Sequence, residues 1–126
     1  MPLVTVTTGK GRTAEQKQKI GDAIHVALVE SGVPAADRFQ RFFELEPENF
    51  IYDKQYPDLS KPRSSQFMII EILLSVGRSV KVKKKILASL VGQMKTLGYD
   101  PNDVFVVFRE TSWENWAFGN GEILHV

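Results

Sequence analysis

The feature that most constrains the fold is an internal repeat with an offset of 66 residues. When the chain is shifted by that offset without a gap, the segment Gly11-Arg12-Thr13 falls on Gly77-Arg78-Ser79. Further residues that match at this offset are Lys17 with Lys83, Lys19 with Lys85, Ile20 with Ile86, Gly32 with Gly98, Asp37 with Asp103, Phe39 with Phe105, Phe42 with Phe108 and Glu44 with Glu110. A self-match of this length predicts two copies of one supersecondary unit.

The first copy has the pattern of a strand, a helix and a second strand. Residues 3–8 alternate apolar residues with threonine, which is typical of a half-buried strand. Thr13 with Gln16 forms a capping-box pattern that predicts the start of a helix. Gly32 suits the end of that helix, and residues 39–45 form the second predicted strand.

The second copy repeats this order. Residues 67–76 form an almost continuous apolar run, broken by Glu71 and Ser75, which is typical of a central strand covered on both faces. Ser79 is positioned to cap the next helix, Gly98 to end it, and residues 104–109 predict the last long strand.

Two β-α-β units predict an α+β fold, with a four-stranded mixed sheet and both helices on one face because the crossovers are right-handed. The other face would then be bare and apolar, which is unstable in water, so we expect a homo-oligomer. The expected single domain covers residues 1–126 and consists of a first unit (2–45), a spacer (46–66), a second unit (67–110) and a tail (111–126).

The spacer and the tail are both rich in aromatic residues. The spacer is too long for a plain turn, and we expect it either to hold a short edge strand at residues 50–52 or to pack on a neighbour. The tail contains Trp113, Trp116 and Phe118. It should therefore pack on something, as a hairpin added to a neighbouring sheet or as the wall of a pocket.

Composition excludes several kinds of site and argues against others. The 126 residues contain no cysteine, which excludes disulfides, thiolate metal sites and cysteine catalysis. The two histidines are far apart, which argues against a histidine-rich metal site. The net charge of +1 gives no electrostatic reason to expect nucleic acid or membrane partners, and the lysine run at residues 81–85 is interpreted as a solvated face. No apolar run has transmembrane length, so a soluble cytoplasmic protein is expected.

The start of the chain, Met1-Pro2, leads directly into the first predicted strand. Because Pro2 is small, we expect Met1 to be removed, which would leave a secondary amine fixed by the sheet. An apolar pocket with nearby cations would lower the pKa of that amine. The amine could then act as a general base or as a nucleophile near pH 7. The alternative interpretation is that Pro2 is only a common second residue.

These features together resemble the tautomerase superfamily. A Pro after Met, a strand, Gly-Arg-Thr at a helix start and a duplicated β-α-β unit all match its pattern. The long form is similar to the malonate semialdehyde decarboxylase and cis-3-chloroacrylic acid dehalogenase branches, and the decarboxylase branch is closely resembled by residues 32–40, 63–65 and 115–121. The resemblance implies a trimer of duplicated units and an active site at the amino-terminal proline that needs no cofactor.

The resemblance also implies roles for individual residues. Arg78, beside a helix N-terminus, would hold the carboxylate of a small-molecule substrate. Its repeat mate Arg12 has that role in unduplicated members and is here a candidate substrate-binding residue or a relic. Trp116 and Phe118 match the hydrophobic wall near the proline. Asp37 matches an aspartate that handles water in the decarboxylase branch, although its repetition as Asp103 leaves a structural role equally open.

One position departs from the decarboxylase pattern. That branch carries a second arginine two residues before the one matching Arg78, and this chain has Val76 there. Arg38, Arg41 and Arg63 are candidates for the missing cation. The first hypothesis is therefore a tautomerase acting through Pro2. The alternatives are a hydratase or decarboxylase of a three-carbon acid such as malonate semialdehyde, and a non-catalytic oligomeric binding protein.

Overall fold

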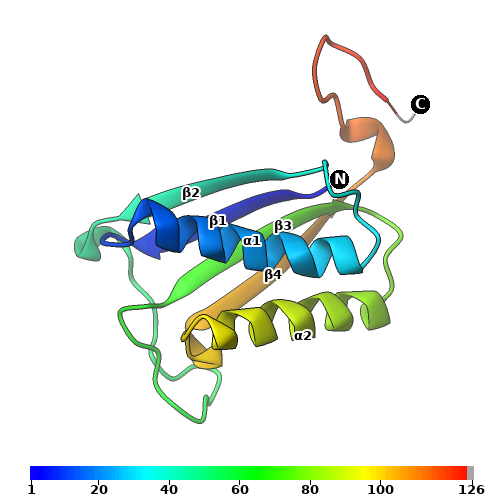
Figure 1. Ribbon diagram of the computed structural model, residues 1–126. Helices are drawn as coiled ribbons and strands as arrows, with labels where there is room; N and C mark the ends of the chain where they lie inside the picture. Colours follow the sequence, from blue (N-terminus) through cyan, green and yellow to red (C-terminus); the bar gives the residue numbers. More distant parts are fainter. Residues whose placement is uncertain (125–126) are drawn as a thin grey trace.

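The computed structural model describes residues 1–124, in which two helices cover one face of a four-stranded sheet (Figure 1). The elements are β1 (Leu3–Gly9), α1 (Ala14–Glu30), β2 (Phe39–Leu45), β3 (Met68–Ser75), α2 (Val80–Thr96) and β4 (Val104–Thr111). Short 3₁₀ turns lie at Pro47–Asn49, Pro101–Asp103 and Trp113–Asn115. The predicted fold class is confirmed.

The strand order is β2-β1-β3-β4. Within each unit the two strands are parallel, whereas the central strands β1 and β3 are antiparallel, with Leu3 opposite Leu73 and Thr8 opposite Met68. The first residues of β1 and the last residues of β3 therefore lie at the same end of the strands. We call each of the two ends of the strands an edge of the sheet. This register brings the start of the chain close to the segment that leads into α2.

The two units are similar in local detail. Both helices have 17 residues, and α2 begins and ends 66 positions after α1. Each follows a glycine with a positive φ, 120° at Gly11 and 119° at Gly77, a conformation that glycine adopts without strain. Thr13 and Ser79 then accept a hydrogen bond from the third residue of their helix, which satisfies a free backbone N–H group.

An ion pair recurs at equivalent positions in both units. Lys17 of α1 pairs with Glu44 of β2, and Lys83 of α2 pairs with Glu110 of β4 at 3.0 Å. The hydrogen bond from Lys17 is the main cause that holds the pKa of Glu44 below its ordinary value. These four repeated residues therefore join a helix to a strand and do not indicate a functional site.

The core lies between the sheet and the helices. Alternate residues of β1 and β3 point toward the helices and are almost fully buried, as are the helix residues spaced by three or four that face them. This core includes Val4, Val6, Ile20, Ile24, Leu28, Ile70, Ile72, Leu74, Ile86, Leu90 and Met94. Each such side chain contributes about 1.5–3 kcal/mol by its burial.

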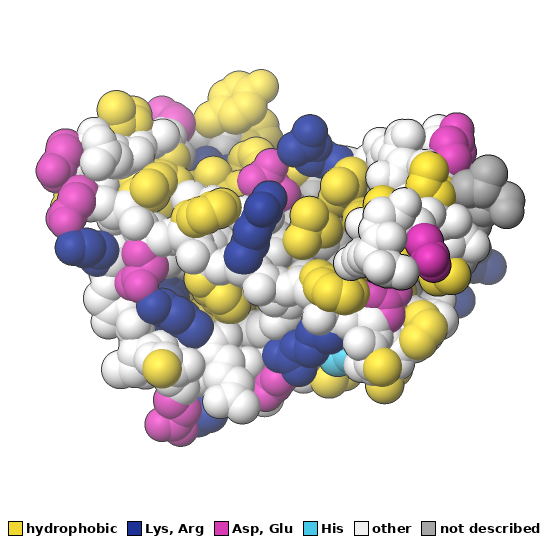
Figure 2. Space-filling view, turned by 90° about the horizontal axis from the view of Figure 1, so that it is seen from above, with side chains coloured by type: hydrophobic (Ala, Val, Ile, Leu, Met, Phe, Trp, Pro, Cys, Tyr) yellow, Lys and Arg dark blue, Asp and Glu magenta, His cyan; other side chains and the backbone are white. Residues whose placement is uncertain are grey.

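The opposite face of the sheet carries half-exposed aromatic side chains, including Phe43 and Phe105. A polar band crosses its middle, where Arg41 Nε donates to Thr5 Oγ1 at 2.9 Å and Arg109 lies 3.8 Å from Glu71. Seen from above, the molecule shows hydrophobic side chains interspersed with basic and acidic ones (Figure 2). We refer to this uncovered side as the open face.

The spacer does not contain the edge strand suggested for residues 50–52, so that alternative is wrong. The rings of Phe50 and Tyr52 instead pack on Phe67, with centroids 5.6 and 4.3 Å away. The spacer thus fills a gap on its own chain. The tail leaves the sheet after β4 and extends beyond it near the start of the chain (Figure 1). Within residues 1–124, no helix is long and apolar enough to cross a membrane.

Candidate active site

The register of the central strands determines where the chain begins. Continuing the Leu3–Leu73 pairing by two residues sets Met1 opposite Ser75, and Pro2 is buried between the flanking strands. Pro2 directly precedes the first paired residue of β1, Leu3.

Asp37 lies at the amino terminus. Its Oδ2 atom is 2.7 Å from the amino nitrogen of Met1, and the two side chains are only 15% and 10% exposed. The loop that carries Asp37 is held to α1, because His25 Nε2 lies 2.8 Å from the carbonyl oxygen of Ala35. The structure thus brings a largely enclosed carboxylate to the first nitrogen of the chain.

Arg78 lies at the same edge of the sheet, in the turn between β3 and α2. Its Nη1 atom donates to the carbonyl oxygen of Ser75 at 3.2 Å, which occupies one of the five N–H donors of the guanidinium. Ser79 then caps α2. The adjacent helix N-terminus and the guanidinium together suit a carboxylate ligand.

The tail forms an aromatic wall at this edge. The Trp116 indole donates to Ser75 Oγ at 2.9 Å, and its ring stacks on Phe118 with centroids 5.8 Å apart and planes 6° apart. Phe118 also lies 6.0 Å from the ring of Phe39, the β2 residue paired with Leu3. The tail aromatics thus pack against the last residue of β3 and the first residue of β2.

Arg12 lies elsewhere. Its Nη2 atom donates to the carbonyl oxygen of Gln66 at 2.7 Å, and its guanidinium lies 5.3 Å from the centre of the Tyr99 ring. These contacts are at the opposite edge of the sheet, where β1 ends and β3 begins. Within one chain, therefore, Pro2, Asp37, Arg78 and the tail aromatics come together and Arg12 does not.

Comparison with known proteins identifies the family of the chain. Two family models, both described as tautomerase enzyme, match residues 37–119 and 2–57. The chain is 32% identical over 123 residues to the probable tautomerase YusQ of Bacillus subtilis (strain 168), a match that covers 96% of this chain and 95% of that protein. The chain belongs to the tautomerase superfamily.

Solved structures resemble this chain over almost its whole length. Two crystal structures of malonate semialdehyde decarboxylase, one of the FG41 enzyme inhibited by 3-bromopropiolate, are 31% and 32% identical to it, each with a TM-score of 0.88. These matches cover 96% of this chain and 92% and 93% of the others. A symmetric trimer described as fused 4-OT is 24% identical with a TM-score of 0.76, covers 96% and 94% of the two chains, and supports the fold alone.

As the sequence indicated, Arg78 has no second arginine two residues before it. Val76 is 42% exposed at the position of the missing arginine. The three alternative arginines have other partners: Arg38, which directly follows Asp37, pairs with Asp22 at 2.7 Å, Arg41 donates to Thr5, and Arg63 donates to the carbonyl oxygens of Asp53 and Tyr56. Arg78 remains the candidate for binding a substrate carboxylate.

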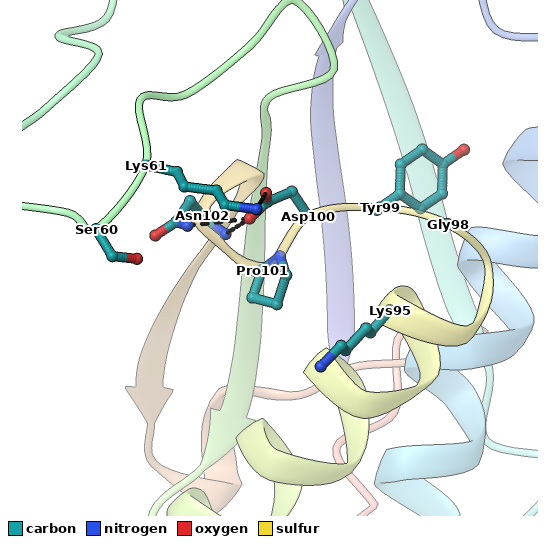
Figure 3. Close-up of a pocket in the computed structure, with 8 residues that line it drawn as sticks. All are labelled: Ser60, Lys61, Lys95, Gly98, Tyr99, Asp100, Pro101 and Asn102. Carbon is teal, nitrogen blue, oxygen red and sulfur yellow. Dashed lines mark hydrogen bonds and ion pairs between the residues drawn. The ribbon is translucent and has the colours of Figure 1, made fainter.

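A hollow of about 440 Å³ lies at the other edge, around the loop after α2 (Figure 3). Its polar groups are paired with each other. Asp100 accepts hydrogen bonds from the backbone N–H and the side-chain amide of Asn102 at 2.9 and 3.0 Å, and lies 3.9 Å from Lys61. The backbone hydrogen bond from Asn102 is the main cause that lowers the pKa of Asp100. This hollow is far from Pro2 and is not the candidate site of the tautomerase.

Two residues of the site were not predicted from the sequence. Phe39 stood out only as a repeat anchor, although it lies two positions after Asp37. Ser75 stood out only as a break in an apolar strand, yet it is fully buried and contacts both Trp116 and Arg78. The available signal was that Ser75 is a polar residue at the end of an apolar strand and that its repeat mate is Gly9.

Proposed function

We propose that this protein is a tautomerase that moves a proton between carbon and oxygen of a small α-keto or enol carboxylic acid. The amine of Pro2 is the general base. The observation that carries this proposal is the convergence of the buried chain start, Arg78 and the Trp116–Phe118 wall at one edge of the sheet.

Removal of Met1 is part of the proposal. While Met1 is attached, the nitrogen of Pro2 belongs to an amide and is not basic. After removal, the secondary amine becomes the first atom of the chain, next to the strand residue Leu3. Its position needs no side-chain rotamer to be fixed, which lowers the entropy cost of reaching the reactive geometry.

The reaction then needs few groups. The lone pair of Pro2 takes a proton from the carbon beside the ketone, and negative charge develops on the resulting enolate oxygen. Arg78 binds the neighbouring carboxylate and stabilises that charge. The protonated Pro2 returns the proton to oxygen. Trp116, Phe118 and Phe39 exclude water, so the interaction between Arg78 and the enolate is stronger than in solution.

A second candidate is hydration or decarboxylation of a three-carbon acid such as malonate semialdehyde. Asp37 favours it, because its loop brings a largely enclosed carboxylate to the start of the chain, where it would orient a water molecule beside Pro2 once Met1 is removed. The similarity to two malonate semialdehyde decarboxylases also favours it. The exposed Val76, at the position of the second arginine of the decarboxylase branch, weighs against it.

Assembly is the third part of the proposal. We infer a homotrimer that covers the open face, because half-exposed Phe43 and Phe105 would otherwise remain in water. Native mass spectrometry of the wild type should give three chains per particle, and Phe43→Glu should dissociate it. A monomeric wild type would contradict this inference.

The deciding experiment is the intact mass of the protein followed by two assays, ketonisation of phenylpyruvate enol and decarboxylation of malonate semialdehyde. Wild type and Pro2→Ala are compared in both. The proposal expects Met1 to be absent, ketonisation to dominate, and the variant to lose activity while remaining assembled. If Met1 is retained and the wild type is inactive in both assays, the protein is better described as a non-catalytic oligomeric binding protein. If Pro2→Ala is as active as the wild type, Pro2 is not the general base.

A further inference from the structure

Ser75 occupies an unusual position for a polar side chain. It is the last residue of β3, its relative exposure is 0%, and it has the same strand parity as Leu73 and Glu71, which belong to the open face. A buried hydroxyl is tolerated when it is hydrogen-bonded. Here the partner comes from the tail rather than from the sheet, since the indole N–H of Trp116 donates to Ser75 Oγ at 2.9 Å.

Ser75 also connects the other parts of the site. Its carbonyl oxygen accepts from Arg78 Nη1 at 3.2 Å, and the strand register sets it opposite Met1. The next residue contributes as well, because the indole of Trp113 donates to the carbonyl oxygen of Val76 at 3.1 Å. Of the two indole bonds that anchor the tail, only the one to Ser75 depends on a side chain of β3.

The internal repeat allows Ser75 to be compared with the equivalent residue of the first unit. The residue equivalent to Ser75 in the first unit is Gly9, which has no side chain to accept a hydrogen bond. No tail crosses that end of the sheet in the described residues. The hydroxyl is thus present at the end that carries the amino terminus and missing at the end that does not.

We propose that Ser75 is a positioning residue for the reaction at Pro2, which it serves by fixing the Trp116 wall relative to Arg78 and the chain start. The inference rests on the proposed function for its activity readout. Ser75 does not touch the reacting atoms: its hydroxyl orients Trp116, and its backbone carbonyl restrains Arg78.

The experiment is a double-mutant cycle with Ser75→Ala, Trp116→Phe and the double variant in the ketonisation assay. Each single variant should lower kcat/KM about tenfold, and the double variant should be no worse than either single one, because both remove the same hydrogen bond. Ser75→Thr retains the hydroxyl and should recover most of the activity. Ser89→Ala is the matched control, since Ser89 bonds Glu30 between the helices at 2.6 Å, and it should be fully active.

A second measurement does not depend on activity. The protein has two tryptophans, so its proton NMR spectrum should contain two indole N–H resonances, and Trp116→Phe assigns them. In Ser75→Ala the Trp116 resonance should move upfield while the Trp113 resonance stays. If the Trp116 resonance does not move, or if the losses of the two single variants multiply in the double variant, the proposal is overturned.

The two hypotheses fail in different ways. If Pro2→Ala is fully active but the Trp116 resonance moves in Ser75→Ala, the proposed chemistry is wrong and the anchoring of the wall stands. If Pro2→Ala is inactive but Ser75→Ala is as active as wild type, the chemistry stands and Ser75 has no positioning role.

Discussion

The two edges of the sheet are built from equivalent residues and end in different arrangements. At one edge, Asp37 pairs with the amino group of Met1 at 2.7 Å. At the other, its repeat mate Asp103 accepts hydrogen bonds from the backbone N–H and the hydroxyl of Ser64 at 2.7 and 2.6 Å. Asp37 thus contacts the amino terminus, whereas Asp103 contacts a residue inside the spacer.

The arginines differ in the same way. Arg78 lies beside Ser75 and the tail wall, whereas Arg12 is covered by Tyr99 and bound to the carbonyl oxygen of Gln66. The spacer is what closes the second edge, because it supplies both Ser64 and Gln66. The same local geometry would therefore serve the proposed chemistry where the chain begins, whereas the spacer uses it to hold the fold together at the other edge.

The largest expected effect separates the two arginines. Arg78→Ala should lower kcat/KM by about 10²–10³-fold, because it removes the charge that stabilises the enolate. Arg12→Ala should mainly cost about 1 kcal/mol of stability, through loss of one hydrogen bond and a cation–π contact. Steady-state kinetics and urea denaturation of both variants test this. Equal losses of activity would show that the two edges do not differ in function.

Replacing Asp103 should mainly reduce stability, and replacing Asp37 should mainly reduce activity. Asp103→Ala should destabilise the fold by about 3 kcal/mol, because a buried carboxylate with two hydrogen bonds is lost and the Ser64 N–H is left without a partner. Asp37→Ala should change stability less than Asp103→Ala, because its ion pair with the amino group of Met1 is already absent once Met1 is removed, and it should reduce activity. Denaturation midpoints with parallel kinetics measure both. A large loss of stability in Asp37→Ala would assign it a structural role.

A smaller effect concerns the ion pair Lys17–Glu44. The pKa of Glu44 is lowered from its ordinary value of 4.5, mainly by the hydrogen bond from Lys17. A lowered pKa in the folded state means that the stabilisation is fully present above that ordinary value and is lost as the pH falls through the folded value. The difference in Tm between wild type and Glu44→Gln should therefore shrink below about pH 4.5. A difference that is constant from pH 3 to 7 would contradict this.

The smallest effect is expected for Gly9→Ser, which copies Ser75 onto the other edge. A Cβ at Gly9 would meet no heavy atom within 4 Å, so the change should alter stability by no more than about 0.5 kcal/mol. Activity should stay the same. Thermal unfolding and the ketonisation assay check both, and a large change would mean that the two edges communicate through β1.

The fold could be predicted well because the helix caps at Thr13 and Ser79 and the apolar alternation depend on neighbouring residues, and the repeat shows both signals twice. The members of the site could be predicted less completely. Whether Arg12 or Arg78 lies near Pro2 depends on the antiparallel pairing of β1 with β3, and this pairing is not encoded in either unit alone. The roles of Phe39 and Ser75 depend in addition on where the tail crosses the sheet, a contact between residues about 40–80 positions apart.

The enclosed amino group of Met1 has a practical consequence for anyone who produces the protein. A purification tag fused to this end would turn that nitrogen into an amide and would have to pass through a space where Met1 is only 10% exposed. Such a preparation would keep the Pro2 nitrogen in an amide, and under the proposed function it would block the removal of Met1. A tag is better placed after the tail, beyond Phe118, or attached at the amino end through a protease site that leaves no extra residue.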